Sequence, residues 1–163
     1  MGRWSDLEPF DEDFFDSAPY RSSYRVELPV PPERVWAELT GDQPLAWCRL
    51  LDNGRYTSER PYGVGTTRTM RVGKGLLSLR ERYLRWDEGR RHSFYVTQAT
   101  LPLFRRFGED YLLDPTPEGC RLTWTFAHEP GPLQAAAGPL GRKLNGVLER
   151  SLIRDTRRHF RAR

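Results

Sequence analysis

A long helical pattern at the C-terminus constrains the fold of this chain more than any other feature. Apolar or small side chains recur at helical spacing in residues 132–163, at Leu140, Leu144, Val147, Leu148, Ser151 and Leu152. A continuous helix over 139–161 would be roughly 35 Å long, at about 1.5 Å per residue. A helix of that length needs a broad apolar surface, and the only candidate is a sheet made from the segments before it.

Strand-like segments separated by short turn sequences precede this helix. An alternating segment at 24–28 is followed by a short helix that begins at Pro31 and Pro32, and residues 44–50 predict a second short helix. Six more strands are expected, at 51–59, 65–72, 76–86, 91–100, 105–114 and 120–128. Their links are short and rich in Gly, Pro and Asp, which indicates an antiparallel meander. The expected class is therefore α+β, a curved antiparallel sheet of about seven strands around the long helix.

Length and composition narrow the class of protein. The 163 residues suggest one domain, and 20 aromatic residues supply the bulk of a core in a chain that is 29% charged. No run of 18 apolar residues occurs, so no membrane span is expected. Cys48 and Cys120 are too few for a disulfide framework or a zinc site, so a reduced, cytoplasmic protein is expected.

Charge is distributed unevenly between the two ends of the chain. Residues 1–20 hold six acids and one Arg, giving −5, whereas residues 150–163 hold six Arg and one Asp, giving +5. We expect residues 1–21 to be an acidic, flexible arm that is dispensable for folding, with Trp4, Phe10, Phe14 and Phe15 available to dock part of it. The charge runs are either solvated or pair with each other, within one chain or between subunits.

Alternation within the predicted strands indicates which side chains face the helix. In the last strand, Trp124 and Phe126 share the inner face with His128. On two earlier strands, Glu81 and Glu109 fall on the inner face among apolar neighbours, as expected for the polar groups of a ligand pocket. The predicted ligand-binding residues are Glu81, Tyr83, Phe94, Gln98, Phe107, Glu109, Tyr111, Trp124, Phe126, Leu140, Leu144 and Leu148.

Three stretches carry a resemblance to a known superfamily. They are Val-Pro-Pro-Glu-Arg-Val-Trp at 30–36, Glu81-Arg82 with Trp86-Asp87, and Arg-Leu-Thr-Trp-Thr-Phe at 121–126. With the order of elements, they resemble the helix-grip superfamily of START lipid-transfer domains, birch-pollen allergens and bacterial polyketide cyclases. The nearest group is the bacterial polyketide cyclase/dehydrase and lipid transport proteins, often labelled SRPBCC. The resemblance covers about residues 22–161 and implies a single helix-grip domain over 22–163 with a cavity for apolar ligands beneath the helix. It carries over no catalytic motif.

Glu109 and His128 are the candidate catalytic residues. A carboxyl group in an apolar cavity has a raised pKa and can act as a general acid or base. The alternative is that Glu109 forms a structural ion pair with an Arg of another strand, such as Arg68, Arg71 or Arg80. A His at the end of a strand is more often a capping or packing residue, which is the alternative for His128, and His92 and His159 are expected to be exposed. Three scattered His and two Cys give no metal site, and no cofactor motif is present.

Three functions stay open. The first is a binding protein for an apolar or aromatic small molecule, lipid or polyketide-like. The second is a cofactor-free cyclase or dehydratase in which Glu109 moves protons. The third is an interaction protein in which the acidic arm and the basic helix end engage a partner or a second subunit. In each case the protein is expected to be a monomer or a homodimer. No nucleic-acid motif accompanies the basic charge, so no nucleic-acid partner is expected. An unpaired Glu109 in an open cavity favours the enzyme, an Arg-paired Glu109 favours binding, and a collapsed cavity favours interaction.

Overall fold

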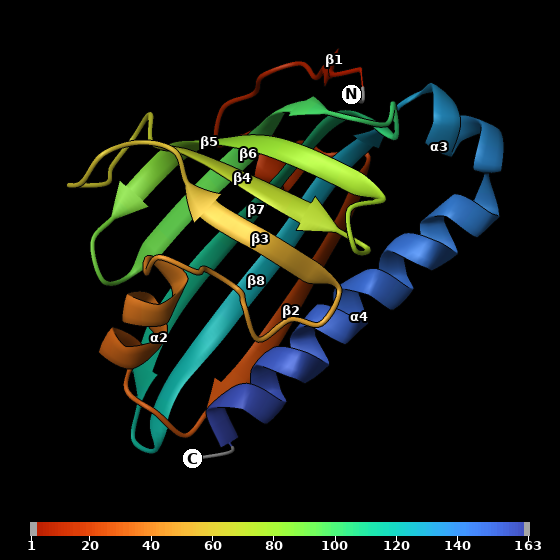
Figure 1. Ribbon diagram of the computed structural model, residues 1–163. Coiled ribbons are helices and arrows are strands. Elements are labelled where there is room, and N and C mark those ends of the chain that lie inside the picture. The colour runs from red at the N-terminus through yellow and green to blue at the C-terminus, as the bar shows by residue number, and fades with distance from the viewer. Residues whose placement is uncertain (1–2, 162–163) are drawn as a thin grey trace.

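Seven strands form one curved antiparallel sheet, and a long helix lies along its open side (Figure 1). The computed structural model describes residues 3–161. The strands are β2 (Tyr20–Leu28), β3 (Leu51–Tyr56), β4 (Thr67–Val72), β5 (Leu77–Asp87), β6 (Arg91–Ala99), β7 (Phe104–Thr116) and β8 (Gly119–Pro130), in the spatial order β2-β8-β7-β6-β5-β4-β3. The predicted sheet is confirmed, with each strand within a few residues of its expected bounds.

One of the two predicted short helices is present. Helix α2 (Pro32–Leu39) begins with Pro in its first turn and buries Val35, Trp36 and Leu39. Residues 44–50 form turns instead of the second predicted helix. Leu45 has a φ of 60°, in the left-handed region that ends a right-handed helix, and its side chain is buried. A turn at Leu45 thus replaces the predicted helix, and it still directs the Leu45 side chain into the interior.

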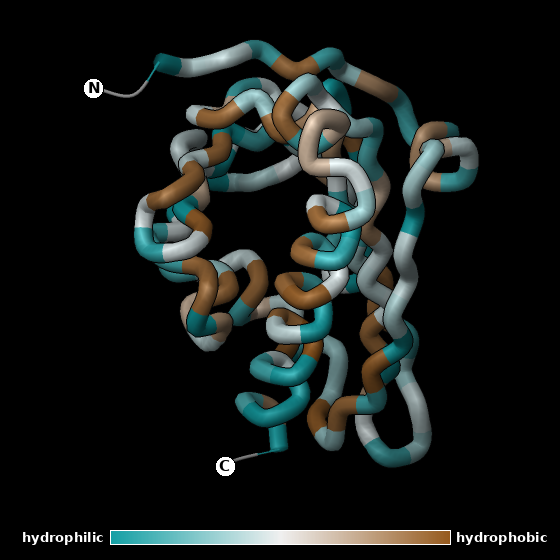
Figure 2. Tube along the Cα trace, turned by 90° about the vertical axis from the view of Figure 1, so that its right-hand side faces the viewer, coloured by the Kyte–Doolittle hydropathy of each residue, from teal (hydrophilic) through white to brown (hydrophobic). Residues whose placement is uncertain are grey.

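The N-terminal segment runs along the outside of the sheet (Figure 2). Strand β1 (Ser5–Asp6) pairs with β6, and helix α1 (Phe14–Ser17) buries two phenylalanines. The ring of Phe10 lies over Gly108, where an added Cβ would come within 2.4 Å of it. The predicted arm is thus docked by its aromatic side chains, and its dispensability for folding stays a prediction.

The acids of this arm pair with arginines of the sheet. Glu8 pairs with Arg105 at 2.9 Å, and Glu12 pairs with Arg85. Both arginines project from the outer face of the sheet, whereas the C-terminal helix lies along its open side (Figure 1). The expectation that the acidic arm crosses that helix within one chain is therefore wrong for the described residues.

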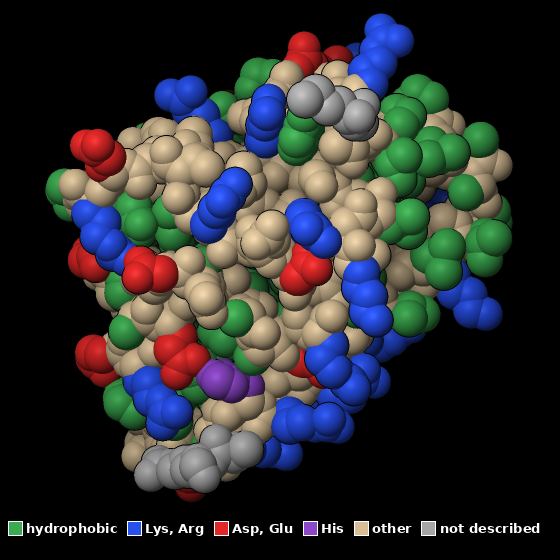
Figure 3. Space-filling view, in the orientation of Figure 1, with side chains coloured by type: hydrophobic (Ala, Val, Ile, Leu, Met, Phe, Trp, Pro, Cys, Tyr) green, Lys and Arg blue, Asp and Glu red, His purple; other side chains and the backbone are tan. Residues whose placement is uncertain are grey.

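The C-terminal helix has an exposed first half. Helix α3 (Pro132–Ala137) leads into α4 (Pro139–Arg161), whose 23 residues match the predicted helix, and residues 162–163 lie outside the described part. Leu140, Leu144 and Val147 are exposed, and Figure 3 shows hydrophobic side chains over α3 and the start of α4, with Lys and Arg along the rest. Over residues 3–161, no helix is both long and apolar enough to cross a membrane.

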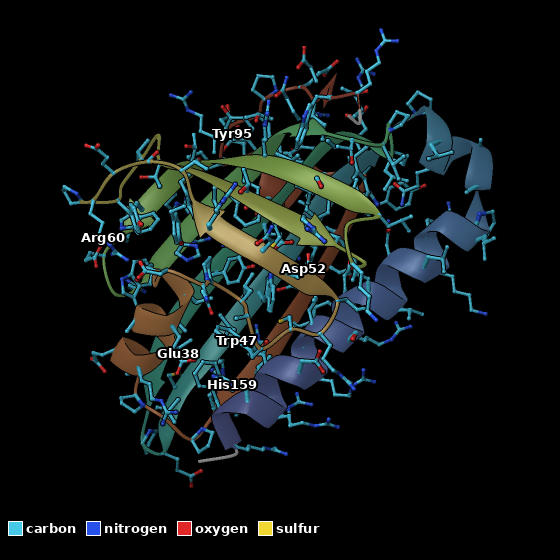
Figure 4. All side chains as sticks on the ribbon, in the orientation of Figure 1. Glu38, Trp47, Asp52, Arg60, Tyr95 and His159 are labelled. Atoms are coloured by element: carbon cyan, nitrogen blue, oxygen red, sulfur yellow. The ribbon has the colours of Figure 1, made fainter. Side chains whose placement is uncertain are left out.

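The second half of α4 is anchored by polar and aromatic contacts. Trp47 donates a 2.9 Å hydrogen bond from Nε1 to Thr156, and Asp155 accepts one of 2.9 Å from the backbone of Arg49. The ring of His159 stacks on Trp47 at 4.9 Å and lies 2.5 Å from a carboxylate oxygen of Glu38 (Figure 4). These contacts fix the second half of α4 against α2 and the turns that follow it, and they leave the first half with fewer constraints.

Candidate functional site

A mostly apolar cavity lies between the sheet and α4. Its walls come from β3, β4, β5, β7, β8, α4 and the turn after α2. The lining residues are Leu45, Leu51, Arg68, Met70, Val72, Leu77, Leu79, Glu81, Phe104, Phe107, Glu109, Phe126, Asn145, Leu148, Glu149 and Leu152. The space open to the centres of water-sized spheres is about 60 Å³. Since one water needs roughly 10–15 Å³ of such space, the cavity has room for a few waters as it stands.

Arg68 and Glu81 form a buried ion pair at the cavity wall. They are opposite each other on β4 and β5, and Nε of Arg68 lies 2.5 Å from Oε2 of Glu81. Burial alone would lower the pKa of Arg68, but the carboxylate of Glu81 and nearby tyrosines raise it well above its ordinary value. Burial raises the pKa of Glu81, and the guanidinium opposes that shift. The expected pairing of Arg68 with Glu109 is therefore wrong, because Glu81 takes that place.

One nitrogen of this guanidinium is left without a partner. Nη1 of Arg68 is buried and donates no hydrogen bond to any of the described residues. The guanidinium carbon lies 4.7 Å from the centre of the Phe94 ring, so an aromatic face covers part of the group. Buried donors without partners are rare in native proteins, which makes this atom a candidate contact for a ligand.

Glu109 is held by neutral donors. Its Oε2 accepts hydrogen bonds from the Tyr111 hydroxyl at 2.6 Å and from Trp124 Nε1 at 3.0 Å. Across residues 3–161 no cation forms an ion pair with it. Burial raises the pKa of Glu109 to about 7, against the opposing effect of the Tyr111 hydrogen bond. This carboxyl group is therefore close to half protonated near neutral pH and can both release and accept a proton.

The two buried histidines have different surroundings. His128 stacks on Tyr20 at 5.3 Å, and burial lowers its pKa to about 4. No hydrogen bond joins it to Glu109 within the described chain, so the structure does not bring the two catalytic candidates together. His92 is fully buried beside Trp36 and Tyr111, and burial lowers its pKa to about 3. The expected exposure of His92 is wrong, because the close packing of aromatic rings encloses it.

The predicted site residues separate into three groups. Glu81, Phe107, Glu109, Phe126 and Leu148 line the cavity. Tyr83, Phe94, Tyr111 and Trp124 face inward as predicted, but they are packed together away from the cavity, each at most 1% exposed. Gln98, Leu140 and Leu144 lie elsewhere.

A break in strand register accounts for Gln98. The pairing of β5 with β6 shifts between Arg80 and Glu81, so Gln98 is opposite Arg80 on the outer face. There its amide donates to Asp6 of the N-terminal segment at 2.8 Å. The predicted inward orientation of Gln98 is therefore wrong, since one extra residue reverses the alternation.

The rotation of α4 accounts for the two leucines. Asn145, Leu148 and Leu152 line the cavity, whereas Leu140 and Leu144 are 61% and 59% exposed. The apolar stripe read from the sequence is wider than the face that meets the sheet, so its outer edge is left uncovered. The predicted contact of Leu140 and Leu144 with a ligand is thus wrong for this arrangement.

Sequence reasoning also missed part of the cavity wall. Met70 and Val72 share a face of β4 with Arg68, and simple alternation could have identified them. Phe104 joins Phe107 on the inner face only because the register of β7 shifts between Phe104 and Arg106. No sequence signal marks that shift.

Candidate metal ligands do not converge in the described structure. No group of three or more His, Cys, Asp or Glu side chains is placed to hold a metal ion within residues 3–161.

The curved sheet, the long C-terminal helix and the cavity between them define a helix-grip protein of the SRPBCC superfamily. The chain matches the family described as "Polyketide cyclase / dehydrase and lipid transport" over residues 20–158, and it belongs to this family. Uncharacterized proteins of Mycobacterium tuberculosis and Mycobacterium bovis are 33% identical over 152 residues, covering 92% of this chain and 90% of their own.

Solved structures of low identity share the fold. XoxI of Bacillus cereus has a TM-score of 0.66 at 14% identity, covering 87% of this chain and 96% of its own. Ara h 8.0201 has a TM-score of 0.64 at 12% identity, covering 88% and 99%. The major latex-like protein 151 of Panax ginseng has a TM-score of 0.64 at 15% identity, covering 86% and 97%. At these identities the likeness establishes the fold alone.

Proposed function

We propose that the protein binds an apolar small molecule whose body lies in the cavity and whose oxygen acceptor reaches Arg68. The observation that carries this proposal is a buried guanidinium with an unpartnered Nη1 at the wall of an otherwise apolar cavity. An acceptor on the ligand would satisfy that donor, whereas a pure hydrocarbon would leave it unpaired. The proposed ligand-binding residues are Arg68, Met70, Glu81, Phe104, Phe107, Glu109, Phe126 and Leu148.

The size of the cavity requires α4 to adjust when a large ligand enters. About 60 Å³ of free space cannot hold a lipid or an aromatic polyketide without movement. The first half of α4 is the element suited to move, because Leu140 and Leu144 project outward and add no packing against the sheet. One polar contact there is exposed, a 3.1 Å hydrogen bond from Arg142 to the Tyr20 hydroxyl. The anchored second half would serve as the fixed end of this movement.

A fluorescent apolar probe tests for the cavity. We expect the neutral dye N-phenyl-1-naphthylamine to bind saturably to one site. Leu148→Trp adds bulk to the cavity wall and should abolish binding, and Leu144→Trp makes the same change on the exposed face and should leave binding intact. Absence of saturable binding in the wild type, or equal binding by both variants, would refute the proposed site.

A matched pair of ligands tests the role of Arg68. 2-Acetylnaphthalene and 2-ethylnaphthalene have similar shapes, but only the first carries an acceptor oxygen. We expect the ketone to bind about tenfold more tightly, the size of effect given by satisfying a buried charged donor. Arg68→Met should remove this preference while some binding of both ligands persists. An equal affinity in the wild type would show that the guanidinium does not meet the ligand.

The properties of Glu109 support a second candidate function, that of an enzyme of the cyclase or dehydratase type. Its pKa of about 7, and the lack of an ion pair to it within residues 3–161, suit a general acid and base. With a β-hydroxyketone held by Arg68, the Glu109 carboxylate would take the proton α to the carbonyl. The C–O bond to the hydroxyl would break as the C=C bond forms. The same carboxyl would return its proton to the leaving hydroxyl, which departs as water.

Dehydration of a β-hydroxyketone would test this second candidate. An aromatic β-hydroxyketone that competes with the probe should lose one water in the presence of the protein, detected by mass and by the absorbance of the enone. Glu109→Gln should bind the compound but leave it intact. Binding without conversion by the wild type would restrict the function to binding. The interaction reading has less support than either, because the acids of the arm pair with arginines of their own sheet.

A further inference from the structure

An apolar surface faces outward from the first half of α4. Leu140, Leu144 and Val147 are 61%, 59% and 50% exposed, and Leu133 of α3 is 44% exposed. With roughly 3.6 residues per turn, the three side chains on α4 lie on one face of the helix. Figure 3 shows hydrophobic side chains gathered over α3 and the start of α4. We call these four side chains the leucine face.

Positive charge lies along the edge of the leucine face. Lys143, Arg150 and Arg154 are exposed and occupy the neighbouring face of α4. The two acids of this helix, Glu149 and Asp155, are only 5% and 4% exposed. The solvent-exposed surface of α4 over Pro139–Arg161 therefore presents basic and apolar groups together, without acidic side chains.

A second element adds an exposed apolar side chain near the same cavity. Leu76, at the turn between β4 and β5, is 77% exposed. Its neighbours Val72 and Leu77 line the cavity from the sheet side, as Asn145 and Leu148 do from α4. Exposed apolar groups thus flank the cavity from both the hairpin and the helix.

We propose that the leucine face and the β4–β5 hairpin dock this protein on the surface of an anionic lipid bilayer. An amphipathic helix at a bilayer places its apolar face at the boundary of headgroups and acyl chains, with Lys and Arg beside it. Leu140, Leu144 and Val147 supply the apolar part, and Lys143 and Arg150 lie where lipid phosphates would be. Each such basic residue strengthens attachment to an anionic surface. Docking of this kind does not require a ligand in the cavity.

The charge pattern favours a bilayer over the other occupants of such a face. A symmetric contact between two copies would bring the same basic side chains together, and these like charges would repel. A nucleic acid offers phosphates but no apolar layer in which leucine side chains could be buried. An anionic bilayer offers both features within one surface.

Vesicle co-sedimentation tests the proposal with the full chain. We expect binding to phosphatidylcholine vesicles that contain about a third phosphatidylglycerol, and much weaker binding to phosphatidylcholine alone. Raising the salt from roughly 0.15 M to 1 M should weaken binding to the anionic vesicles, because it shortens the range of charge interactions.

Two pairs of variants locate the binding surface. Leu140→Ser/Leu144→Ser should reduce binding by roughly tenfold or more, and Val64→Ser, at an exposed apolar residue on another loop, should not. Lys143→Glu/Arg150→Glu should reduce binding to anionic vesicles by roughly tenfold or more, whereas Arg25→Glu/Arg55→Glu, the same change in net charge on exposed strand positions, should have a small effect. All these side chains are exposed, so unchanged melting temperatures are expected.

Three results would overturn the proposal. The first is no binding of the wild type to anionic vesicles at low salt, and the second is an equal loss of vesicle binding in the patch and control variants. The third is a wild-type dimer in sedimentation analysis that dissociates in Leu140→Ser/Leu144→Ser, which would assign the leucine face to contacts between copies of the chain.

Discussion

The interior of this protein has two ends that differ in packing, although β5, β7 and β8 contribute side chains to both. At the packed end, Tyr83, Phe94, Tyr111 and Trp124 are each at most 1% exposed and pack against one another, and the rings of Tyr83 and Tyr111 also contact His92. At the hollow end, Met70, Phe104, Phe107 and Leu148 border the cavity. Alternation along the strands assigns Phe107 as well as the four packed residues to the inner face, so strand pattern alone does not separate a core residue from a cavity residue.

The element opposite each end accounts for the difference. At the packed end, Trp36 of α2 projects onto the sheet, with its ring centre 5.1 Å from His92 and 5.5 Å from Trp86. At the hollow end, the first half of α4 turns Leu140 and Leu144 away from the sheet. A bulky side chain thus fills one end, and the other keeps a cavity.

The buried ionisable groups lie where the two ends meet. Arg68 contacts the Phe94 ring and also lines the cavity, and Glu109 takes hydrogen bonds from Tyr111 and Trp124 while lining the cavity. The packed end holds these polar groups in one geometry, and the hollow end gives them access to a bound molecule. Rigid support next to open space is the arrangement a preorganised site requires.

The largest expected effect contrasts a side chain from each end. Phe94→Ala should destabilise the protein by about 3–5 kcal/mol, because it opens a cavity in close-packed rings. Leu148→Ala should cost about 1 kcal/mol, because it enlarges a space that already exists. Urea unfolding of both variants at one pH measures the difference. Equal losses would mean that the hollow end is as tightly packed as the other.

The next effect concerns the buried ion pair. Arg68→Met should cost about 3 kcal/mol, at the low end for breaking a buried pair, because Glu81 borders a cavity that water can enter. The double variant Arg68→Met/Glu81→Met should recover most of that loss, since no buried charge is then left unpaired. Urea unfolding of the wild type, both single variants and the double variant gives the coupling between the two residues. A double variant as unstable as Arg68→Met would argue against a loss caused by the unpaired Glu81.

The sequence predicted the sheet, the long helix and the inward orientation of Glu81 and Glu109. These features follow from local periodicity, which a chain records directly. The positions of Gln98 and Phe104 depend on shifts of strand register, and the turn at Leu45 depends on one residue in a left-handed conformation. The register shifts arise from pairing between distant strands. Neither they nor a single residue in a left-handed conformation leave a repeating pattern in the sequence.

The choice of partner for Arg68 was also beyond the sequence. Both Glu81 and Glu109 face inward, so alternation does not tell which of the two carboxylates pairs with the guanidinium. The register of β4 against β5 selects Glu81 as the partner, because it places Arg68 opposite Glu81. Glu109, on β7, then depends on neutral donors from Tyr111 and Trp124. Burial therefore raises the pKa of Glu109 without a paired cation among the described residues to oppose it.

A smaller effect should appear in the dependence of stability on pH. The pKa of Glu109 is raised by burial from 4.5 to about 7, so the folded state holds this proton more tightly than the unfolded state. The wild type therefore loses stability from this group as pH rises from about 4.5 to 7, by at most about 3 kcal/mol. Glu109→Gln, which stays neutral, should gain stability relative to the wild type over that range and show a constant difference above it.

Unfolding free energies of the two proteins between pH 4.5 and 8 provide the measurement. His92 and His128 have lowered pKa values and give the wild type an opposite trend below the pKa of the unfolded histidines. Both proteins share that trend, so their difference isolates Glu109. A difference in unfolding free energy that does not change with pH would show that Glu109 is ionised over the whole range, as a carboxylate in an ion pair would be.

The smallest effect tests how the packed end tunes the hollow one. The Tyr111 hydroxyl donates to Glu109 at 2.6 Å and favours its ionised form. Tyr111→Phe removes that donor, so the pKa of Glu109 should rise further, by about one unit, the equivalent of a modest hydrogen bond to a charged group. Carbon-detected NMR titration of the glutamate side chains follows the change. Tyr95→Phe removes a hydroxyl on the opposite face of the sheet (Figure 4) and should leave the titration unchanged. If the pKa of Glu109 is unchanged in Tyr111→Phe, burial alone sets its proton affinity. The packed end would then enclose Glu109 without affecting its charge through hydrogen bonds.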